Sequence, residues 1–343
     1  MKKLSTLFVS VLLIANLFTA VAQKQQSDLY MTRTFSAASI KSLKVTTSGG
    51  NITVNGNDSS EAVVEVYVNC NKWSNEQIKT VLDENYTIEI HVDNGKLYVV
   101  ANPKGKIKNR KLQGLDISFK INVPKQIDSR LLTNGGCIQI SELSGSQRFI
   151  TSGGSLSVEN VSGNIAGITS GGDITVTNSK DNIDLKTSGG NITAKNCDGK
   201  INIATSGGNL DLSNINGNIN AATSGGNITA SNINGVIKVG TSGGSMKLSD
   251  ISGNLDAKTS GSSMNVTMNL VSDYIKLSNN GNINLTLPID KCYRLKVEAN
   301  KLKTSGLKNF SGDMDSKSID GTIGDGSAEV EIKTSSQVNL SFK

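Results

Sequence analysis

Apolar side chains return at a constant interval of 18 residues through the middle of the chain. The repeated unit opens on Thr-Ser-Gly-Gly or a close variant, and its eight copies start at Thr133, Thr151, Thr169, Thr187, Thr205, Thr223, Thr241 and Thr259. Counting each of these threonines as position 0, the apolar residues fall at positions 5, 7, 10, 14 and 16. The spacing by two predicts two short strands in each copy, whose alternate side chains enter one core. Because one copy cannot bury its own apolar face, the fixed period predicts a stack of coils.

Glycine and asparagine occupy the positions between these predicted strands. Glycine recurs at positions 2, 3 and 12, and asparagine recurs at position 9. Both residues tolerate the positive φ angles of chain reversals, so we expect them at the corners of each coil. The threonine at position 0 continues the inward alternation of positions 14 and 16, which predicts an inward ladder of hydroxyls. The predicted fold class is all-β, a β-solenoid (a single-chain β-helix) of 18-residue coils with irregular β caps.

The first residues of the chain have the pattern of an export signal. Lys2 and Lys3 precede an apolar run, and Ala20-Val21-Ala22 supplies a small-residue cleavage pattern. We therefore predict a signal peptide over 1–22. The apolar run is short for a membrane span, and no later segment of the sequence is apolar enough to cross a bilayer. The sequence thus predicts an exported protein, at the cell surface, in the periplasm or extracellular, with no transmembrane segment in the mature chain.

The repeats are flanked by less regular β structure. Residues 23–132 are predicted to form an N-terminal β region with a short helix and a cap, and Asp93-Asn94-Gly95 is typical of a hairpin turn. An early copy of the repeat at Thr47-Ser48-Gly49-Gly50 indicates that the solenoid begins there and is interrupted by an excursion. The solenoid of eight repeats is predicted over 133–276, and 277–343 are predicted to form C-terminal coils and the second cap.

Three sequence features together resemble a known family. They are the tandem Thr-Ser-Gly-Gly-x-Ile-x-Val units, the segment 117–124 (Ile-Ser-Phe-Lys-Ile-Asn-Val-Pro) and the segment 281–288 (Gly-Asn-Ile-Asn-Leu-Thr-Leu-Pro). In these features the chain resembles the bacterial putative-adhesin family of β-strand repeats, a domain of unknown function. The resemblance covers most of the mature chain and implies adhesion at the envelope or cell surface, with no catalytic residues. Some members are associated with envelope-stress responses, which implies a second role.

Charge adds one candidate contact. The net charge is +6 with the predicted signal peptide included, and the repeats themselves are close to neutral. A basic segment falls in one predicted loop and consists of Lys104, Lys106, Lys108, Arg110 and Lys111. Such a run is either a solvated loop or a contact for anionic glycan or lipid headgroups. Nucleic acid is not an expected partner, because no aromatic residues are interleaved with these cations.

Catalytic and metal-binding patterns are weak. Gly240-Thr241-Ser242-Gly243-Gly244 matches a nucleophile-elbow motif, but it falls on a predicted solenoid corner, and His91 is the chain's one histidine. We expect His91 to be an ordinary half-exposed strand residue. Calcium would require repeated carboxylates, and in the column at position 4 only Asp173 supplies one. The sequence therefore predicts no enzyme activity, no metal site and no cofactor.

The four cysteines pose a separate question, because export permits disulfides. Cys137 is predicted to point outward and Cys197 to lie in the core, about three coils apart, which is too far for a disulfide. A bond between Cys70 and Cys292 stays open.

The outer face of the predicted solenoid is the remaining candidate site. Positions 4 and 6 present small polar groups, and the candidate ligand face consists of Asp173, Thr175, Asn191, Thr193, Asn209, Asn227 and Thr229. Its alternative interpretation is the ordinary wet side of a sheet. The leading functional prediction is a non-enzymatic envelope or surface adhesin that presents this face to glycan or another envelope protein. A periplasmic or envelope stress-response module is the main alternative, and a polysaccharide-active β-helix enzyme is the third.

Overall fold

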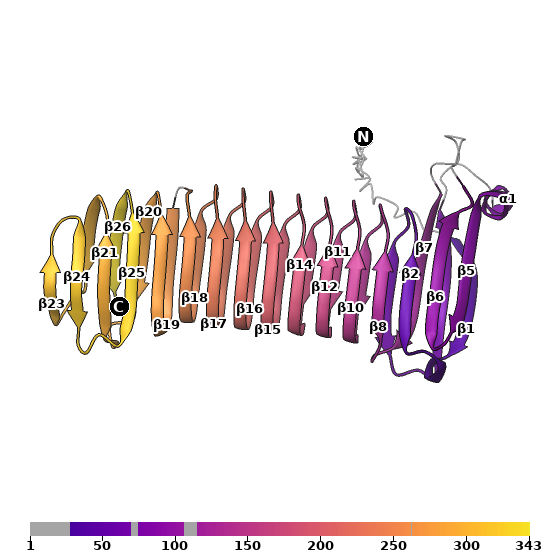
Figure 1. The fold of residues 1–343 in the computed structure, drawn as a ribbon, viewed down its shortest axis with the longest axis horizontal. Helices are drawn as coiled ribbons and strands as arrows, with labels where there is room; N and C mark the ends of the chain where they lie inside the picture. Colours follow the sequence, from indigo (N-terminus) through magenta and orange to yellow (C-terminus); the bar gives the residue numbers. More distant parts are fainter. Residues whose placement is uncertain (1–27, 70–74, 106–114, 262) are drawn as a thin grey trace, which may run out of the picture.

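A computed structural model describes residues 28–69, 75–105, 115–261 and 263–343, which form a rod of stacked β coils (Figure 1). Two long sheets run along the rod, here called sheet I and sheet II, and five long strands belong to both. This arrangement confirms the predicted all-β solenoid. The predicted signal peptide (1–22) lies outside the described residues.

The strands of sheet I are, in spatial order, β1 (Asp28–Ser36), β4 (Glu61–Asn69), β7 (Asp116–Pro124), β3 (Ile52–Asn57), β9 (Ile138–Ser141), β11 (Leu156–Glu159), β13 (Ile174–Thr177), the shared strands β15 (Ile192–Thr205), β16 (Leu210–Thr223), β17 (Ile228–Thr241), β18 (Met246–Thr259) and β19 (Ser263–Asn279), and then β20 (Asn282–Leu287), β26 (Gln337–Phe342) and β22 (Lys301–Ser305).

The strands of sheet II are, in spatial order, β5 (Tyr86–Asp93), β6 (Lys96–Pro103), β2 (Ser42–Thr46), β8 (Asp128–Leu132), β10 (Ser144–Ile150), β12 (Ser162–Ile168), β14 (Lys180–Lys186), the shared strands β15 to β19, and then β25 (Ala328–Thr334), β21 (Tyr293–Glu298), β24 (Ser318–Ile323) and β23 (Phe310–Met314). Two helices complete the described elements, the 3-10 turn η1 (Ala37–Ser39) and the helix α1 (Asn75–Asn85).

The core consists of the predicted apolar columns. Successive coils pair in parallel at an offset of 18 residues, so that Ile201 lies beside Ile219 and Ile219 beside Ile237. These three side chains are almost fully buried. Because each column continues from coil to coil, the repeats share one hydrophobic core along the rod. Cys197 occupies this core as predicted, and burial is the main reason that the pKa of its thiol is raised.

The prediction of two separate short strands holds for the first coils and is wrong for the later ones. In β15 to β18 one strand of 14 residues runs from position 5 to the next threonine. The parallel pairing between these strands continues on both sides of position 9, so the strand bends there without ending. The predicted corner is thus a bend inside a continuous strand.

Two of the predicted corner positions do have positive φ angles. Asn196 at position 9 has φ 53°, Gly199 at position 12 has φ 109°, and their equivalents in the other coils are similar. The expectation of positive φ is wrong for positions 2 and 3. Glycine is required at position 3 for a different reason, because a Cβ on Gly208 would lie 2.0 Å from the carbonyl oxygen of Gly190 in the preceding coil. Close contact between coils therefore selects that glycine.

The threonines form the predicted inward ladder, and their hydroxyls bond to the backbone. Thr205 Oγ1 donates to the carbonyl oxygen of Gly190 at 2.8 Å, and the backbone N–H of Gly208 donates back to Thr205 Oγ1 at 3.2 Å. The same pair of bonds recurs from Thr133 to Thr241. Each buried hydroxyl thus joins its own corner to the preceding coil.

Both ends of the rod place a coil out of chain order. The coil formed by β2 and β3 contains the early Thr-Ser-Gly-Gly copy, and it lies between the β6–β7 coil and the β8–β9 coil. At the other end, the coil formed by β25 and β26 lies between β19–β20 and β21–β22. The early copy is therefore a true coil of the solenoid, and the excursion returns to build the coil outside it.

Antiparallel strands lie beyond these coils. β5 pairs with β6, and β1 and β4 extend sheet I beyond β7, while β23 and β24 extend sheet II at the other end. The hairpin predicted at Asn94 and Gly95 joins β5 to β6, and both residues have positive φ. The parallel stack of coils therefore ends in antiparallel strands at both ends of the rod.

Candidate functional site

The predicted ligand face lies on sheet I, and part of it is used within the fold. Asp173, Asn191, Asn209 and Asn227 form one row at position 4 across the coils, and the Oδ1 of each accepts the backbone N–H of the next coil's position 4 residue at 2.7–2.8 Å. Thr175 lies beside Thr193 at position 6, whereas Thr229 lies beside Asp211. The position 4 oxygens therefore join neighbouring coils, whereas the threonine hydroxyls and the Nδ2 groups of Asn209 and Asn227 point to the outside of this face.

Of the predicted basic loop, only Lys104 falls within the described residues. Lys104 lies just beyond the end of β6, where its Nζ donates to the carbonyl oxygen of Asp83 at 2.5 Å. Lys106, Lys108, Arg110 and Lys111 lie outside the described residues. The structure thus gives Lys104 a role in holding the strand to the end of α1.

A different basic surface lies on the outer face of sheet II, near the N-terminal cap. Five outward side chains on neighbouring strands form one line, here called the basic row: His91 (β5), Tyr98 (β6), Lys44 (β2), Arg130 (β8) and Arg148 (β10). The strands that carry them lie side by side at one end of the sheet (Figure 1). Since neighbouring strands are about 4.8 Å apart, the row places three cations and two rings within about five strand widths.

The two rings of the basic row stack on each other, and Lys44 of the row and the neighbouring Lys96 lie close to Tyr98. The ring of His91 stacks on that of Tyr98, with centroids 5.1 Å apart and planes 12° from parallel. Lys44 Nζ lies 5.8 Å and Lys96 Nζ 5.6 Å from the centre of the Tyr98 ring. These distances permit cation–π attraction, so Tyr98 holds two ammonium groups near one point.

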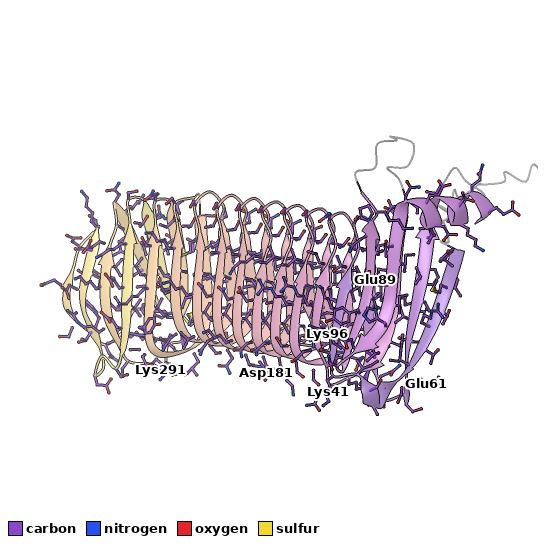
Figure 2. All side chains as sticks on the ribbon, turned by 45° about the vertical axis from the view of Figure 1, so that its right-hand side comes forward. Lys41, Glu61, Glu89, Lys96, Asp181 and Lys291 are labelled. Carbon is purple, nitrogen blue, oxygen red and sulfur yellow. The ribbon has the colours of Figure 1, made fainter. Side chains whose placement is uncertain are left out.

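The cations of this surface are not neutralised by ion pairs. Among the described residues, the ion pairs include none of Lys44, Lys96, Arg130 and Arg148. Carboxylates do border the surface: Glu89 lies opposite Val100 and Asp93 opposite Lys96 across β5 and β6, and Figure 2 shows Glu89 and Lys96 on this face. Asp128 is nearer to the arginines, but its Oδ1 accepts the backbone N–H of Ser146 at 2.8 Å. The positive charge is therefore available to an external anion.

An aliphatic line runs beside the arginines of the basic row, two positions further along β8 and β10, and continues into β12. We call Leu132 (β8), Ile150 (β10) and Ile168 (β12) the aliphatic row. Leu132 is 36% exposed and Ile168 is 44% exposed. The line stops at Lys186 in the next strand. The surface therefore combines cations, an aromatic ring and aliphatic side chains on one flat sheet.

Sequence reasoning missed this surface. His91 was expected to be an ordinary strand residue, and its place on an exposed strand agrees with that, but its stacking partner Tyr98 was not singled out. The available signal was the alternation around Lys44, Tyr98 and Arg130, each of which lies between two inward residues. What the sequence did not indicate was the spatial order of β6, β2 and β8, which brings the three residues together.

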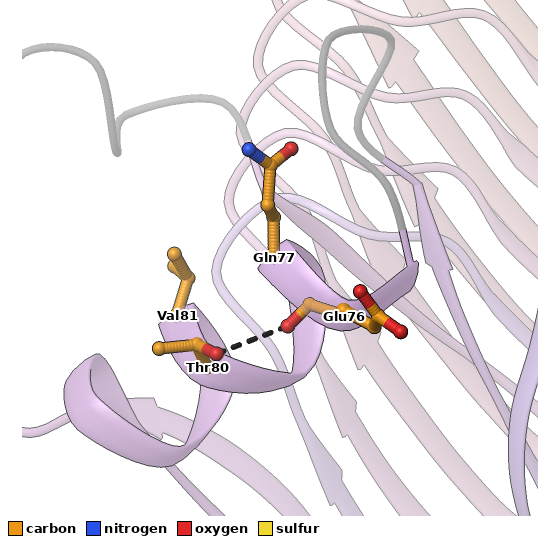
Figure 3. Close-up of a pocket in the computed structure, with 4 residues that line it drawn as sticks. All are labelled: Glu76, Gln77, Thr80 and Val81. Atoms are coloured by element: carbon orange, nitrogen blue, oxygen red, sulfur yellow. Dashed lines mark hydrogen bonds between the residues drawn. The ribbon is translucent and has the colours of Figure 1, made fainter.

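A shallow hollow beside α1 is a weaker candidate. It is lined by Glu76, Gln77, Thr80 and Val81, all from one face of the helix (Figure 3). Thr80 Oγ1 donates to the carbonyl oxygen of Glu76 at 3.0 Å, which is a bond within the helix. The hollow brings together no residues from separate elements of the described chain, so it offers little chemistry for a specific ligand.

Within the described ranges, no three His, Cys, Asp or Glu side chains gather closely enough to hold a metal ion. The helices of those ranges include none that is long and apolar enough to cross a bilayer.

The family of the chain follows from its match to a family model. The model described as Toastrack DUF4097 matches residues 106–338, which is more than half of the chain. The chain belongs to the Toastrack DUF4097 family. This membership confirms the resemblance to an adhesin-like family of unknown function that the repeats and the flanking segments indicated. No curated protein matches the chain.

Three solved structures are similar in part. One is described as a putative cell adhesion protein from Clostridium sporogenes, with 12% identity, 91% of this chain and 98% of that chain covered, and a TM-score of 0.21. A putative adhesin from Bacteroides fragilis has 15% identity, coverage of 74% and 96%, and a TM-score of 0.26. A putative lipid binding protein from Parabacteroides distasonis has 15% identity, the same coverage and a TM-score of 0.28. At these scores the similarity carries no functional conclusion.

Proposed function

We propose that this Toastrack DUF4097 protein is a non-enzymatic, exported envelope or cell-surface protein that adheres to an anionic component of an envelope. The observation that carries the proposal is the basic row on the outer face of sheet II. Its cations have no ion-pair partners among the described residues, and the rod presents them on a rigid sheet. Charges held in this way attract a polyanion without first having to be ordered.

The basic row is a better candidate for the binding surface than the polar face of sheet I. On sheet I the position 4 oxygens are already bonded to backbone N–H groups, which leaves short hydroxyls, the Nδ2 groups of Asn209 and Asn227 and the carboxylate of Asp211, without a cluster of cations among the described residues. The basic row instead offers charge, hydrogen-bond donors and a ring. Arginine is well suited to such a contact, because its planar group can donate two parallel hydrogen bonds to a carboxylate or phosphate.

Retention of the mature chain on dextran sulfate, compared with unmodified dextran, tests the proposal. The basic-row variant Arg130→Glu/Arg148→Glu reverses two cations of the row. The matched control Lys238→Glu/Lys258→Glu reverses two exposed lysines on the same face of sheet II, in β17 and β18. We expect the basic-row variant to elute at much lower salt than the wild type, and the control to elute close to it. Equal elution of the two variants would mean that net charge alone retains the protein, and the proposal would fail.

Protease treatment of intact and lysed cells, followed by immunoblotting for the repeat region, tests the location. Loss of the rod from intact cells supports a surface adhesin. Protection until lysis supports the periplasmic stress-response alternative and removes adhesion to other cells.

A further inference from the structure

We propose that the basic row and the aliphatic row together form a docking surface for an anionic lipid bilayer. This inference rests on the proposed function and makes its anionic component more specific. A soluble polyanion needs only the cations, whereas a bilayer surface offers phosphate groups and, directly beneath them, acyl chains. The aliphatic row stands at the ends of β8, β10 and β12, and the arginines of the basic row lie two residues before those ends. With these strand ends directed into the bilayer, the aliphatic row meets the acyl chains and the basic row meets the phosphates.

The register of the strands produces this order. In β8 and β10, Arg130 pairs with Arg148 and Leu132 with Ile150, so each strand carries one cation and one aliphatic side chain on its outer face. In β12 the sequence continues with Ala166 beside Arg148 and Ile168 beside Ile150. Two neighbouring strands, β8 and β10, therefore contribute to both lines, and β12 extends the aliphatic row alone. Single exposed aliphatic residues scattered over a surface would not form such a line.

The third component is Tyr98. Tyrosine is enriched at membrane–water interfaces, where its ring lies at the level of the headgroups. Here the ring stands in the basic row, between His91 and Lys44, and draws the ammonium group of Lys96 towards the same place. Interfacial segments of proteins combine cations, aromatic rings and aliphatic side chains in this way.

The rest of sheet II supports a local contact. Along the line of the aliphatic row, the strands beyond β12 carry Lys186, Ala204, Ala222, Gly240 and Lys258. Aliphatic side chains of the size of leucine and isoleucine are thus confined to the part of this line that adjoins the arginines. The cations therefore select an anionic partner, and the adjoining aliphatic row selects a lipid surface over a soluble polyanion.

The experiment is co-sedimentation of the mature chain with two kinds of vesicle, phosphatidylcholine alone and phosphatidylcholine mixed with phosphatidylglycerol. The aliphatic variant Leu132→Ser/Ile168→Ser keeps every charge of the basic row. The control variant Val236→Ser changes an exposed aliphatic residue of sheet II in β17, which is 43% exposed. Retention on dextran sulfate is measured for each protein in parallel, and circular dichroism checks that each variant is folded.

We expect the wild type and Val236→Ser to sediment with the anionic vesicles and not with phosphatidylcholine alone. The aliphatic variant should bind anionic vesicles at least about tenfold more weakly, since it loses two apolar contacts with the interface, while its retention on dextran sulfate is unchanged. The lipid inference is wrong if the aliphatic variant binds the vesicles as tightly as the wild type. It is also wrong if no protein binds the vesicles while dextran sulfate still retains the protein through the basic row. In both cases the proposed function stands, with a soluble or glycan polyanion as the partner. If the basic-row variant and its control also elute from dextran sulfate at the same salt concentration, both proposals fail.

Discussion

Ser129 donates its hydroxyl hydrogen bond to the side-chain carbonyl of Gln147 at 2.5 Å inside the apolar core. The two residues are neighbours in one inward column, at position 14, which is occupied by Leu43 on one side and Ile165 on the other. Gln147 Nε2 donates to the carbonyl oxygen of Ile127 at 2.7 Å. A small satisfied polar network therefore replaces isoleucine where the repeats meet the N-terminal coils.

This network predicts strong coupling between its two members. Ser129→Ala leaves the buried oxygen of Gln147 without that donor and should lower the free energy of unfolding by about 1–3 kcal/mol. The double variant Ser129→Ala/Gln147→Leu removes both partners and should cost clearly less than the sum of the two single changes. Urea denaturation of the four proteins in this cycle measures the coupling. Simple additivity of the two single changes would contradict the network.

The glycines at positions 2 and 3 give a matched pair of variants. Gly208→Ala places a Cβ 2.0 Å from the carbonyl oxygen of Gly190, whereas Gly207→Ala places one 3.5 Å from that of Gly189. We expect Gly208→Ala to lower stability by more than about 3 kcal/mol or to prevent folding. Gly207→Ala should change stability by less than about 1 kcal/mol. Thermal unfolding of both variants measures the difference. Similar melting temperatures would contradict the prediction and would mean that the coils can move apart at little cost in free energy.

Asn279 marks a defect in the threonine ladder. It pairs with Thr334 at the end of β19, and its buried Oδ1 has no hydrogen-bond partner. Threonine at this place would supply a hydroxyl that can donate to the preceding coil, as the other members do. Asn279→Thr and Asn279→Ala both lose the bond that Asn279 Nδ2 donates to the carbonyl oxygen of Asn282 at 3.1 Å. Asn279→Thr should therefore be more stable than Asn279→Ala by about 1 kcal/mol, measured by urea denaturation. Asn279→Ala removes both the orphaned oxygen and the Nδ2 donor, so the difference between the two variants isolates the added hydroxyl. A threonine variant no more stable than the alanine variant would contradict the prediction.

Tyr293 should make the C-terminal coils sensitive to alkali. Its hydroxyl donates to the carbonyl oxygen of Pro288 at 2.9 Å, and burial, with a smaller contribution from Cys292, raises its pKa well above the ordinary 10.0. A raised pKa in the folded state means that this contribution to stability is complete below the unfolded pKa and is lost as the pH rises through the folded pKa. Unfolding measured between about pH 8 and pH 11 should show a fall in stability above the ordinary tyrosine pKa.

The variant Tyr293→Phe tests the origin of that fall. At neutral pH it should be less stable than the wild type by about 1 kcal/mol, because it lacks the hydrogen bond to Pro288. Above the ordinary tyrosine pKa its stability should fall less steeply than that of the wild type. Parallel curves for the two proteins would assign the alkaline loss to other groups.

The repeats were predictable from sequence because a coil places each side chain beside its equivalent 18 residues away. Ile201 and Ile219 occupy the same position of successive repeats in the sequence and lie beside each other in the core. The repeat pattern therefore predicts which side chains pack together. The inward direction of Thr205 was predictable from the alternation of side chains. The carbonyl group that accepts its hydroxyl hydrogen bond was not, because the pattern does not indicate which carbonyl of the preceding coil lies within reach.

The candidate surface was not predictable in the same way. Lys44, Tyr98 and Arg130 come from three segments that pair only because one coil is inserted between two others. Sequence order would instead place β6 directly next to β8. Local patterns give the inward or outward direction of each residue, whereas the spatial order of strands outside the repeats depends on long-range pairing.

Because one coil is inserted at each end, the pairings that build the two ends do not depend on how many coils lie between them. Both inserted coils, β2–β3 and β25–β26, pair with a coil on either side. In each case some of the paired strands are distant in sequence. A duplicated or deleted unit of 18 residues between β10 and β18 would leave all of those pairings intact and would move the two ends apart or together by about 4.8 Å. The rod can therefore be lengthened or shortened as a spacer in steps of one coil, with the same terminal structures and the same charged surface at one end.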